Sequence, residues 1–315
     1  MVIDATHTFA PPLDPDFLAL SAAAGGGGVG TGAFDLAATR ADIESALPMP
    51  LAVHAVDVDR VVIDDRTGVA VETFAPTTPG PHPVLLWFHG GGYLLGTPAM
   101  GSARMQSWAA KLGCFAVSVD YRLAPEHPFP AAHDDAVSAL EWLIGSAAEL
   151  GVDRERIVVA GGSAGGGIAA GLVLAARDLG LPLAGQLLLY PMLDDRQQTA
   201  SSAWATPMWS RGANEYAWHA YLGDQPGEVS SYAAPARASQ VTELPPTMVI
   251  VGSADRFLDE DVAYASRLMH AGIPTDLRVY AGAPHGFDVV GAGSSISAAA
   301  IADAEGWLRR RFART

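Results

Sequence analysis

The stretch that decides the fold reads Ile157-Val158-Val159-Ala160-Gly161-Gly162-Ser163-Ala164-Gly165, and an apolar helical pattern follows it from Ile168 to Arg177. The apolar run is typical of a strand that is buried on both faces. A serine between such a strand and a helix, with a glycine two positions away on either side, indicates a sharp turn that lifts its hydroxyl above the sheet edge. The alternative is a glycine-rich loop with an incidental serine, but the flanking elements favour the turn.

Similar apolar runs recur along the chain and predict the rest of the sheet. They are Val84–Phe88, Phe115–Val119, Leu187–Tyr190, Met248–Val251 and Leu277–Tyr280. Helical spacing separates most of them, as in Ala136–Leu150 and Val262–Met269. Because strand and helix alternate, we predict an α/β fold with a mainly parallel sheet and helices on both faces. Two antiparallel strands, Val53–Ile63 and Val69–Phe74, are expected at one edge.

Two segments interrupt this alternation. Residues 1–50 are loop-rich, with a short helix expected over Asp35–Leu47, and residues 194–244 contain no clear strand. The second segment holds the aromatic residues Trp204, Trp209, Tyr216, Trp218 and Tyr221. These side chains fit either a pair of core helices or a helical lid whose aromatics partly face a pocket. We favour a lid insertion at 194–244, with residues 51–193 and 245–315 forming the main domain.

Composition excludes several partners and mechanisms. The formal net charge of −15 argues against nucleic-acid binding, because that requires clustered basic residues. Lys111 is the only lysine and does not stand in a Gly-Lys-Ser/Thr motif, so a P-loop is excluded. The Gly-x-Gly-x-x-Gly pattern within Gly25–Gly30 has no strand before it, so a flexible linker is favoured over a dinucleotide site.

Cysteine content and hydropathy bear on the compartment. Cys114 is the only cysteine, so no intramolecular disulfide can form, which fits a reducing compartment and a cytoplasmic location. It opens an apolar run, which favours a small buried side chain over a nucleophile. No signal peptide is evident in Met1–Pro12. The uncharged stretch Ile157–Ala176 resembles a membrane span, but its glycines would break a lone helix, so we expect no span.

A glycine run follows the strand that ends at Phe88: His89-Gly90-Gly91-Gly92. Glycines let backbone N–H groups approach a developing negative oxygen without obstruction by side chains. We expect an oxyanion hole formed by the N–H groups of Gly91, Gly92 and Ala164. The alternative is a simple tight turn, and His89 is expected to have a structural role.

A serine nucleophile needs a base and an orienting acid, and nine histidines compete for the first role. His285 is favoured because it follows the last predicted strand directly, where doubly wound sheets place their chemistry. Asp255 has the same kind of position one strand earlier, so it is the expected acid. The rival carboxylates are Asp259, Glu260 and Asp261, which fit the acidic first turn of a helix, and the post-strand pair Asp194 and Asp195.

Together these motifs resemble those of the hormone-sensitive-lipase-like bacterial esterases, often called family IV, which have the α/β-hydrolase fold. Further matching stretches are Asp120–Glu126 with Pro128–Ala131, Leu258–Glu260 after Asp255, and His285–Phe287. The resemblance covers Val53 to the C-terminus. Gly162 stands where this group usually has Asp or Thr, and Gly167 where it often has Asn, which leaves the subgroup and the acyl preference open.

The resemblance implies a serine carboxylesterase that hydrolyses short- to medium-chain acyl esters through an acyl-enzyme, with Ser163, Asp255 and His285 as catalytic triad. It also implies that residues 1–50 contribute to the lid, that the partner is a small-molecule ester, and that a homodimer is a compatible assembly. No cofactor or metal is expected. The same triad would also serve an amidase, lactonase, carbamate hydrolase or arylformamidase. A non-catalytic small-molecule receptor on this fold is a weaker alternative, because all three triad residues are present.

Overall fold

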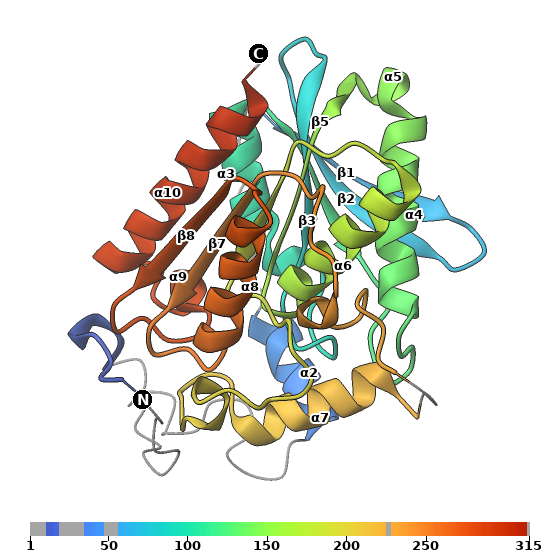
Figure 1. Ribbon diagram of the computed structural model, residues 1–315. Coiled ribbons are helices and arrows are strands. Elements are labelled where there is room, and N and C mark those ends of the chain that lie inside the picture. The colour runs from blue at the N-terminus through green and yellow to red at the C-terminus, as the bar shows by residue number, and fades with distance from the viewer. Residues whose placement is uncertain (1–10, 19–34, 47–55, 225–227, 314–315) are drawn as a thin grey trace.

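The computed structural model describes residues 11–18, 35–46, 56–224 and 228–313 (Figure 1). Its centre is an eight-stranded sheet with the order β1-β2-β4-β3-β5-β6-β7-β8. The strands are β1 Val56–Asp64, β2 Val69–Pro76, β3 His82–Phe88, β4 Phe115–Asp120, β5 Val152–Gly162, β6 Gly185–Leu189, β7 Thr247–Gly252 and β8 Thr275–Tyr280. β2 pairs antiparallel with β1 and β4, and all other neighbours pair parallel. The predicted mainly parallel α/β sheet with an antiparallel edge is therefore confirmed.

Helices cover both faces of this sheet (Figure 1). The helices of the structure include α2 Leu36–Ala46, α3 Ser102–Leu112, α4 Ala131–Gly145, α5 Ala147–Leu150, α6 Ala164–Leu179, α7 Arg211–Leu222, α8 Leu258–His270, α9 Phe287–Val290 and α10 Ser295–Phe312. Successive strand residues point to opposite faces, so they supply two buried clusters. Leu86 and Val159 belong to the cluster that includes α4, α6 and α8, whereas Leu85 and Val158 belong to the one that includes α3 and α10. Burial on both faces explains the continuous apolar runs in the sequence.

The structure moves some of the predicted boundaries. The helical pattern over Ala136–Leu150 is two helices, α4 and α5, because Ser146 between them leaves the helical region with φ −98° and ψ 9°. β6 ends at Leu189 rather than at Tyr190, whose φ of 38° is not that of a strand. α10 was not among the predicted elements, and it packs Trp307 against the sheet.

The segment 194–244 contains α7 and two short 3-10 turns, Ser201–Ala203 and Pro235–Arg237. Trp218 and Tyr221 of α7 pack against Tyr93, with ring centroids 5.4 and 3.8 Å apart, so these two aromatics fit the core alternative. Trp209 is also buried, but its indole lies against Gly92 in the glycine run. α7 and α2 both lie at the end of the sheet where β8 leads into α9 (Figure 1). The role of this segment as a lid stays a prediction.

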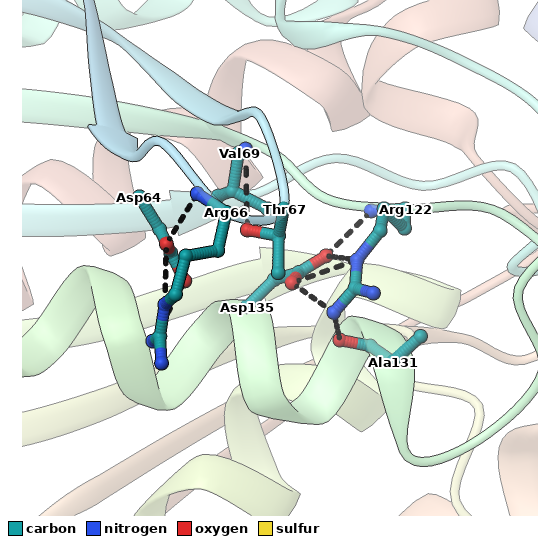
Figure 2. A network of polar contacts seen from close by, with 7 residues as sticks. All are labelled: Asp64, Arg66, Thr67, Val69, Arg122, Ala131 and Asp135. Atoms are coloured by element: carbon teal, nitrogen blue, oxygen red, sulfur yellow. Dashed lines mark hydrogen bonds and ion pairs between the residues drawn. The ribbon is translucent and has the colours of Figure 1, made fainter.

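An ion pair between a partly exposed arginine and a buried carboxylate anchors the loop after β4 to α4 (Figure 2). The Arg122 guanidinium donates to both oxygens of Asp135 at 2.6 to 3.0 Å, and the Arg122 backbone N–H adds a bond of 2.8 Å. Close by, Arg66 bonds to Asp64 in the turn between β1 and β2. Because Asp135 is shielded from water, its pairing with Arg122 holds the loop firmly in place.

Three further predictions concern a membrane span, the side chain of Cys114 and the glycine pattern near the N-terminus. Within the described ranges, no helix has both the length and the apolar character needed to cross a membrane. Cys114 is buried and unpaired, and burial raises the pKa of its thiol to about 12, so it packs as a small apolar side chain. The glycine pattern Gly25–Gly30 lies outside the described residues.

Candidate active site

Ser163 occupies the turn between β5 and α6, and its backbone has φ 55° and ψ −122°. Such a conformation costs a residue with a side chain roughly 1–3 kcal/mol, so its surroundings must hold it. The Ser163 N–H donates to the carbonyl oxygen of Leu189 at 2.9 Å, and the Ser163 carbonyl oxygen accepts from the N–H groups of Gly167 and Met192. Backbone hydrogen bonds from the end of β6, the strand next to β5, therefore hold the strained conformation of Ser163.

Two glycines of the motif, Gly161 and Gly165, are required because other backbone atoms lie too close for a side chain. A Cβ at Gly161 would overlap the backbone of Gly165, and a Cβ at Gly165 would overlap the backbone of Phe88 at the end of β3. At Gly162 a Cβ would meet the ring of Tyr190 at 3.5 Å, which is ordinary contact. Gly162 therefore has no side chain on the side of the turn that faces Tyr190.

The three predicted triad residues meet at the carboxyl-terminal edge of the sheet. His285 Nε2 lies 2.9 Å from Ser163 Oγ, and His285 Nδ1 lies 2.8 Å from Asp255 Oδ2. Asp255 is fully buried, while Ser163 and His285 each expose 7% of their surface. With Nδ1–H donating to the carboxylate, Nε2 is free to accept the hydroxyl proton. The arrangement can therefore activate Ser163 as a nucleophile.

The position of Asp255 is set by the turn after β7. Its Oδ1 accepts the backbone N–H of Phe257 at 3.0 Å, which leaves Oδ2 for His285. The rings of Phe257 and Tyr190 both stand edge-on to the imidazole, with centroids 5.0 and 4.9 Å away. The acid and the base are thus confined by both hydrogen bonds and apolar contacts.

Four of the five rival carboxylates are engaged by other groups, and the fifth, Asp261, is buried. Asp259 Oδ2 accepts the N–H of Ser201 at 2.7 Å, and Glu260 Oε1 accepts the N–H groups of Leu193 and Asp194. Asp261 is fully buried, and its carboxylate oxygens find no hydrogen-bond partner within the described chain. Burial raises the pKa values of Glu260 and Asp261 well above their ordinary range, so both favour the neutral acid. Asp194 and Asp195 form ion pairs with Arg196 and Arg237.

The glycine run after β3 forms a tight loop beside Ser163. Gly91 has φ 122° and Gly92 has φ 61°, conformations that favour glycine. The Gly91 carbonyl oxygen accepts the N–H groups of Leu94 and Leu95, which turns the loop back on itself. The N–H groups of Gly91, Gly92 and Ala164 have no acceptor within the part of the chain that the structure describes. Unpaired N–H groups are what the predicted oxyanion hole requires, and the assignment of these three donors stays a prediction.

His89 has the structural environment that the sequence led us to expect. Its Nδ1 lies 2.8 Å from the carbonyl oxygen of Gly90, and its ring stacks on Tyr121 at 4.3 Å. Burial lowers the pKa of His89 to about 4, so the imidazole stays neutral. The Tyr121 hydroxyl donates to the His89 carbonyl oxygen at 2.7 Å, which ties the glycine loop to the loop after β4.

The sequence did not single out two buried residues that border the triad. Arg256 follows Asp255, and its guanidinium donates to the carbonyl oxygens of Ser202, Trp204 and Trp209. It thereby attaches the segment 194–244 to the loop that carries the acid. Tyr190 contacts His285 from the end of β6. Their only signal in the sequence is that each ends or follows a predicted strand, which many other residues also do.

Within the described part of the chain, no group of three or more His, Cys, Asp or Glu side chains is arranged to hold a metal ion. The triad itself contains a hydroxyl, an imidazole and a carboxylate between which a proton can be transferred.

Comparisons with known proteins agree with this geometry. A family model described as alpha/beta hydrolase fold matches residues 85–289. The chain is 35% identical over 257 residues to esterase LipI of Mycobacterium tuberculosis, covering 75% of each chain. It is 36% identical over 237 residues to carboxylesterase NlhH of the same organism, covering 71% of this chain and 72% of the relative. A solved structure of a bacterial heroin esterase superposes with a TM-score of 0.88 at 37% identity, over 97% of this chain and 99% of the other.

These matches span most of the chain, and the family model covers Ser163, Asp255 and His285. The chain belongs to the α/β-hydrolase family. Within that family, its similarity to bacterial carboxylesterases confirms the resemblance to the hormone-sensitive-lipase-like group that the motifs indicated.

Proposed function

We propose that this chain, a carboxylic ester hydrolase, cleaves short- to medium-chain acyl esters through an acyl-enzyme formed on Ser163. The observation that carries the proposal is the continuous line of hydrogen bonds from Asp255 through His285 to Ser163, at 2.8 and 2.9 Å. The relatives named esterase and carboxylesterase support the ester as the bond that is cleaved.

The proposed reaction begins when Ser163 Oγ attacks the ester carbonyl carbon and His285 Nε2 accepts its proton. Asp255 keeps the imidazole oriented and stabilises its charged form. The imidazolium then protonates the alcohol oxygen, the carbon–oxygen bond breaks, and an acyl-serine remains. Water, deprotonated by the same imidazole, attacks this acyl group, and the acid leaves as Ser163 regains its proton.

In both steps the carbonyl oxygen becomes negative and needs fixed donors. We assign this role to the N–H groups of Gly91, Gly92 and Ala164, which find no partner within the described residues. A single donor of this kind typically lowers the barrier by about 3 kcal/mol. Because the donors belong to a rigid turn and to the first turn of α6, little reorganisation is needed as charge develops.

The segment 194–244 supports a preference for small acyl groups. Arg256 fixes its Ser202–Trp209 portion through three carbonyl oxygens, and the indole of Trp209 then lies against Gly92. A bulky ring this close to an oxyanion donor limits the space beside the ester carbonyl. We therefore retain the interpretation of this segment, together with the N-terminal residues, as a lid over the substrate.

Active-site labelling tests the proposal directly. A fluorophosphonate should modify the wild-type protein at Ser163, as located by peptide mass spectrometry, and the Ser163→Ala variant should resist it while melting at a similar temperature. That variant should also lose ester turnover. A wild-type protein that binds small molecules but resists labelling would favour the receptor alternative, and activity retained in the variant would contradict the role of Ser163.

A substrate panel tests the bond and the chain length. We expect p-nitrophenyl acetate and butyrate to be cleaved faster than palmitate, and esters faster than matched amides, lactones, carbamates and aryl formamides. Activity confined to emulsified long-chain triglycerides would contradict the chain-length preference. A cytoplasmic location and a homodimer stay predictions, which fractionation of the source cells and light scattering of the purified chain would check.

A further inference from the structure

Tyr190 stands in an unusual place directly after β6. Its φ is 38°, although it is not glycine, and such strain persists only where the surroundings over-determine it. Its N–H donates to Ile250 O at 2.6 Å, and the preceding residue, Leu189, accepts the N–H of Ser163. With this backbone, the Tyr190 ring lies beside both the nucleophile turn and the imidazole of His285.

The Tyr190 ring contacts the imidazole of His285 and borders the turn that carries the nucleophile. It stands edge-on to His285, with centroids 4.9 Å apart and planes inclined by 72°. It would also lie 3.5 Å from a Cβ at Gly162, the residue before the nucleophile. A glycine at that position leaves this side of the turn to the tyrosine, so the ring supports His285 where a longer side chain would compete for space.

The phenol hydroxyl of Tyr190 is held by a buried ion pair. It donates to Asp288 Oδ1 at 2.5 Å, and Arg104 donates to Asp288 Oδ2 at 2.5 Å. Asp288 belongs to α9, which begins two residues after His285, and Arg104 belongs to α3. Arg104 is itself held over the rings of Trp87 and Trp108, at 5.7 and 5.6 Å from the ring centroids.

The protonation states are consistent with this set of bonds. Burial raises the pKa of the Tyr190 phenol well above its ordinary value, so the hydroxyl keeps its proton and donates it to the carboxylate. Burial opposes the charge on Arg104, but the Asp288 carboxylate outweighs this and raises the pKa of the guanidinium. The negative charge of Asp288 is thus matched by a positive charge inside the protein.

We propose that Arg104, Asp288 and Tyr190 form a positioning network for His285, in which Arg104 cancels the charge of Asp288 and Asp288 fixes the ring that supports the imidazole. The inference rests on the proposed function, because it assigns the network a purpose in serine hydrolysis. None of the three residues touches the reacting atoms, so they act through His285.

The network predicts an electrostatic effect that a purely structural contact would not produce. If Arg104 is removed, the carboxylate of Asp288 is left without a counter-ion, one phenol ring away from His285. An unmatched negative charge at such a distance stabilises the imidazolium. At an effective dielectric constant of about 20, this moves the pH at which the imidazolium loses its proton upward by about one unit. His285 itself contacts Asp255 and Ser163. The other charged or titratable groups near this pair are Arg256, Glu260 and Asp261, which interact electrostatically with Asp255.

The experiment measures kcat/KM for a soluble acetate ester against pH in a series of variants. The acid limb of this profile reports the ionisation of the base in the free enzyme. Arg104→Met should move the limb upward by about one pH unit, and Arg104→Met combined with Asp288→Asn should restore it, because charge and counter-charge are then both absent. Arg104→Lys keeps a cation and should leave the limb in place. If Arg104→Met folds poorly, the kcat of Tyr190→Phe still tests the network.

A matched control comes from the same helix. Lys111 of α3 pairs with Glu305 of α10 at 3.0 Å, away from the triad. Lys111→Met removes one cation from the same helix, although Glu305 keeps Arg309 at 3.8 Å, and it should leave the limb where it is in the wild type. If Lys111→Met moved the limb as far as Arg104→Met, the effect would be one of overall charge and the network would be rejected.

A second variant tests the ring support. Tyr190→Phe keeps the ring but loses the hydroxyl bond to Asp288, so kcat should fall about tenfold with KM little changed, because only the positioning of the base is affected. An unmoved acid limb in Arg104→Met, no restoration in the double variant, or an unchanged kcat in Tyr190→Phe would each overturn the inference. The wild-type protein separates the two proposals: if it resists fluorophosphonate at Ser163, the proposed function fails, whereas normal labelling with unmoved limbs rejects only the network.

Discussion

Two loops at the same edge of the sheet each carry a buried histidine beside glycine, yet they provide different environments. His89 follows β3, bonds to the carbonyl oxygen of Gly90 and stacks on Tyr121. His285 follows β8 and lies between a carboxylate and a hydroxyl. Both rings are more than nine-tenths buried. Burial therefore does not distinguish a base from a structural histidine, and the decisive feature is the carboxylate on the second ring nitrogen.

The largest expected effect comes from replacing His285, with the replacement of His89 as the comparison. His285→Ala should lower kcat by about 10⁶-fold, because a triad without its base loses almost the whole contribution of the triad. His89→Phe, which preserves the stacked ring, should stay within about tenfold of the wild type. Steady-state rates on a soluble acetate ester measure both. Comparable losses in the two variants would remove the distinction between the loops.

The next effect concerns the carboxylate that distinguishes them. Asp255→Asn should lower kcat by about 10⁴-fold, because the amide no longer holds the imidazole in the productive tautomer. Asp259→Asn is the matched control, since its side chain oxygen accepts from the Ser201 N–H and an amide oxygen can do the same. A larger loss in Asp259→Asn than in Asp255→Asn would mean that the acid has been wrongly assigned.

The glycine loop beside His89 should respond in its own way. Gly92→Ala should lower kcat by about 10²–10³-fold, because a Cβ there would overlap the Trp209 indole and displace an oxyanion donor. Adding Trp209→Ala should recover part of the loss. Gly113→Ala is the control: its φ of 62° imposes the same backbone strain with no atom within 4 Å of the new Cβ. That control should lower the melting temperature but not kcat.

The last effect is on stability rather than on rate, and it concerns His89. Its pKa falls from 6.5 to about 4 on burial, so between these values the unfolded chain binds more protons than the folded one. The stabilisation is complete above about pH 6.5 and is lost as pH falls toward 4, by about 3 kcal/mol in all. Urea unfolding at several pH values should show a shallower acid loss in His89→Phe. His133, whose pKa burial also lowers to about 4, contributes equally to both proteins.

Much of this architecture could be predicted from the sequence because the patterns that indicate it involve residues close together in the chain. Apolar runs such as Val84–Phe88 predicted the central strands, since burial on both faces leaves no room for polar residues. The nucleophile turn could be recognised because close backbone contacts at Gly161 and Gly165 admit only glycine. The break between α4 and α5 at Ser146 carried no such signature, and the apolar spacing continued across it.

The site was predictable to a similar depth. Ser163, Asp255 and His285 could be proposed because each directly follows a predicted strand, and parallel strands end at one edge. The choice of Asp255 over Asp259 rested on the acidic first turn of α8, which the structure contains. The network of Tyr190, Asp288 and Arg104 could not be found in this way. Its hydrogen-bonded pairs are far apart in sequence: Tyr190 and Asp288 by 98 residues, and Arg104 and Asp288 by 184.

Residue order alone was enough for the alternation of strand and helix, the strained turn at Ser163 and the candidates for base and acid, because each depends on neighbours within a few positions. Folding was needed to bring Tyr190 against His285, Trp209 against Gly92 and Arg256 beneath the backbone of residues 202–209. Those contacts join segments that only the packed sheet brings together, and their strength comes from burial, which a linear pattern does not encode.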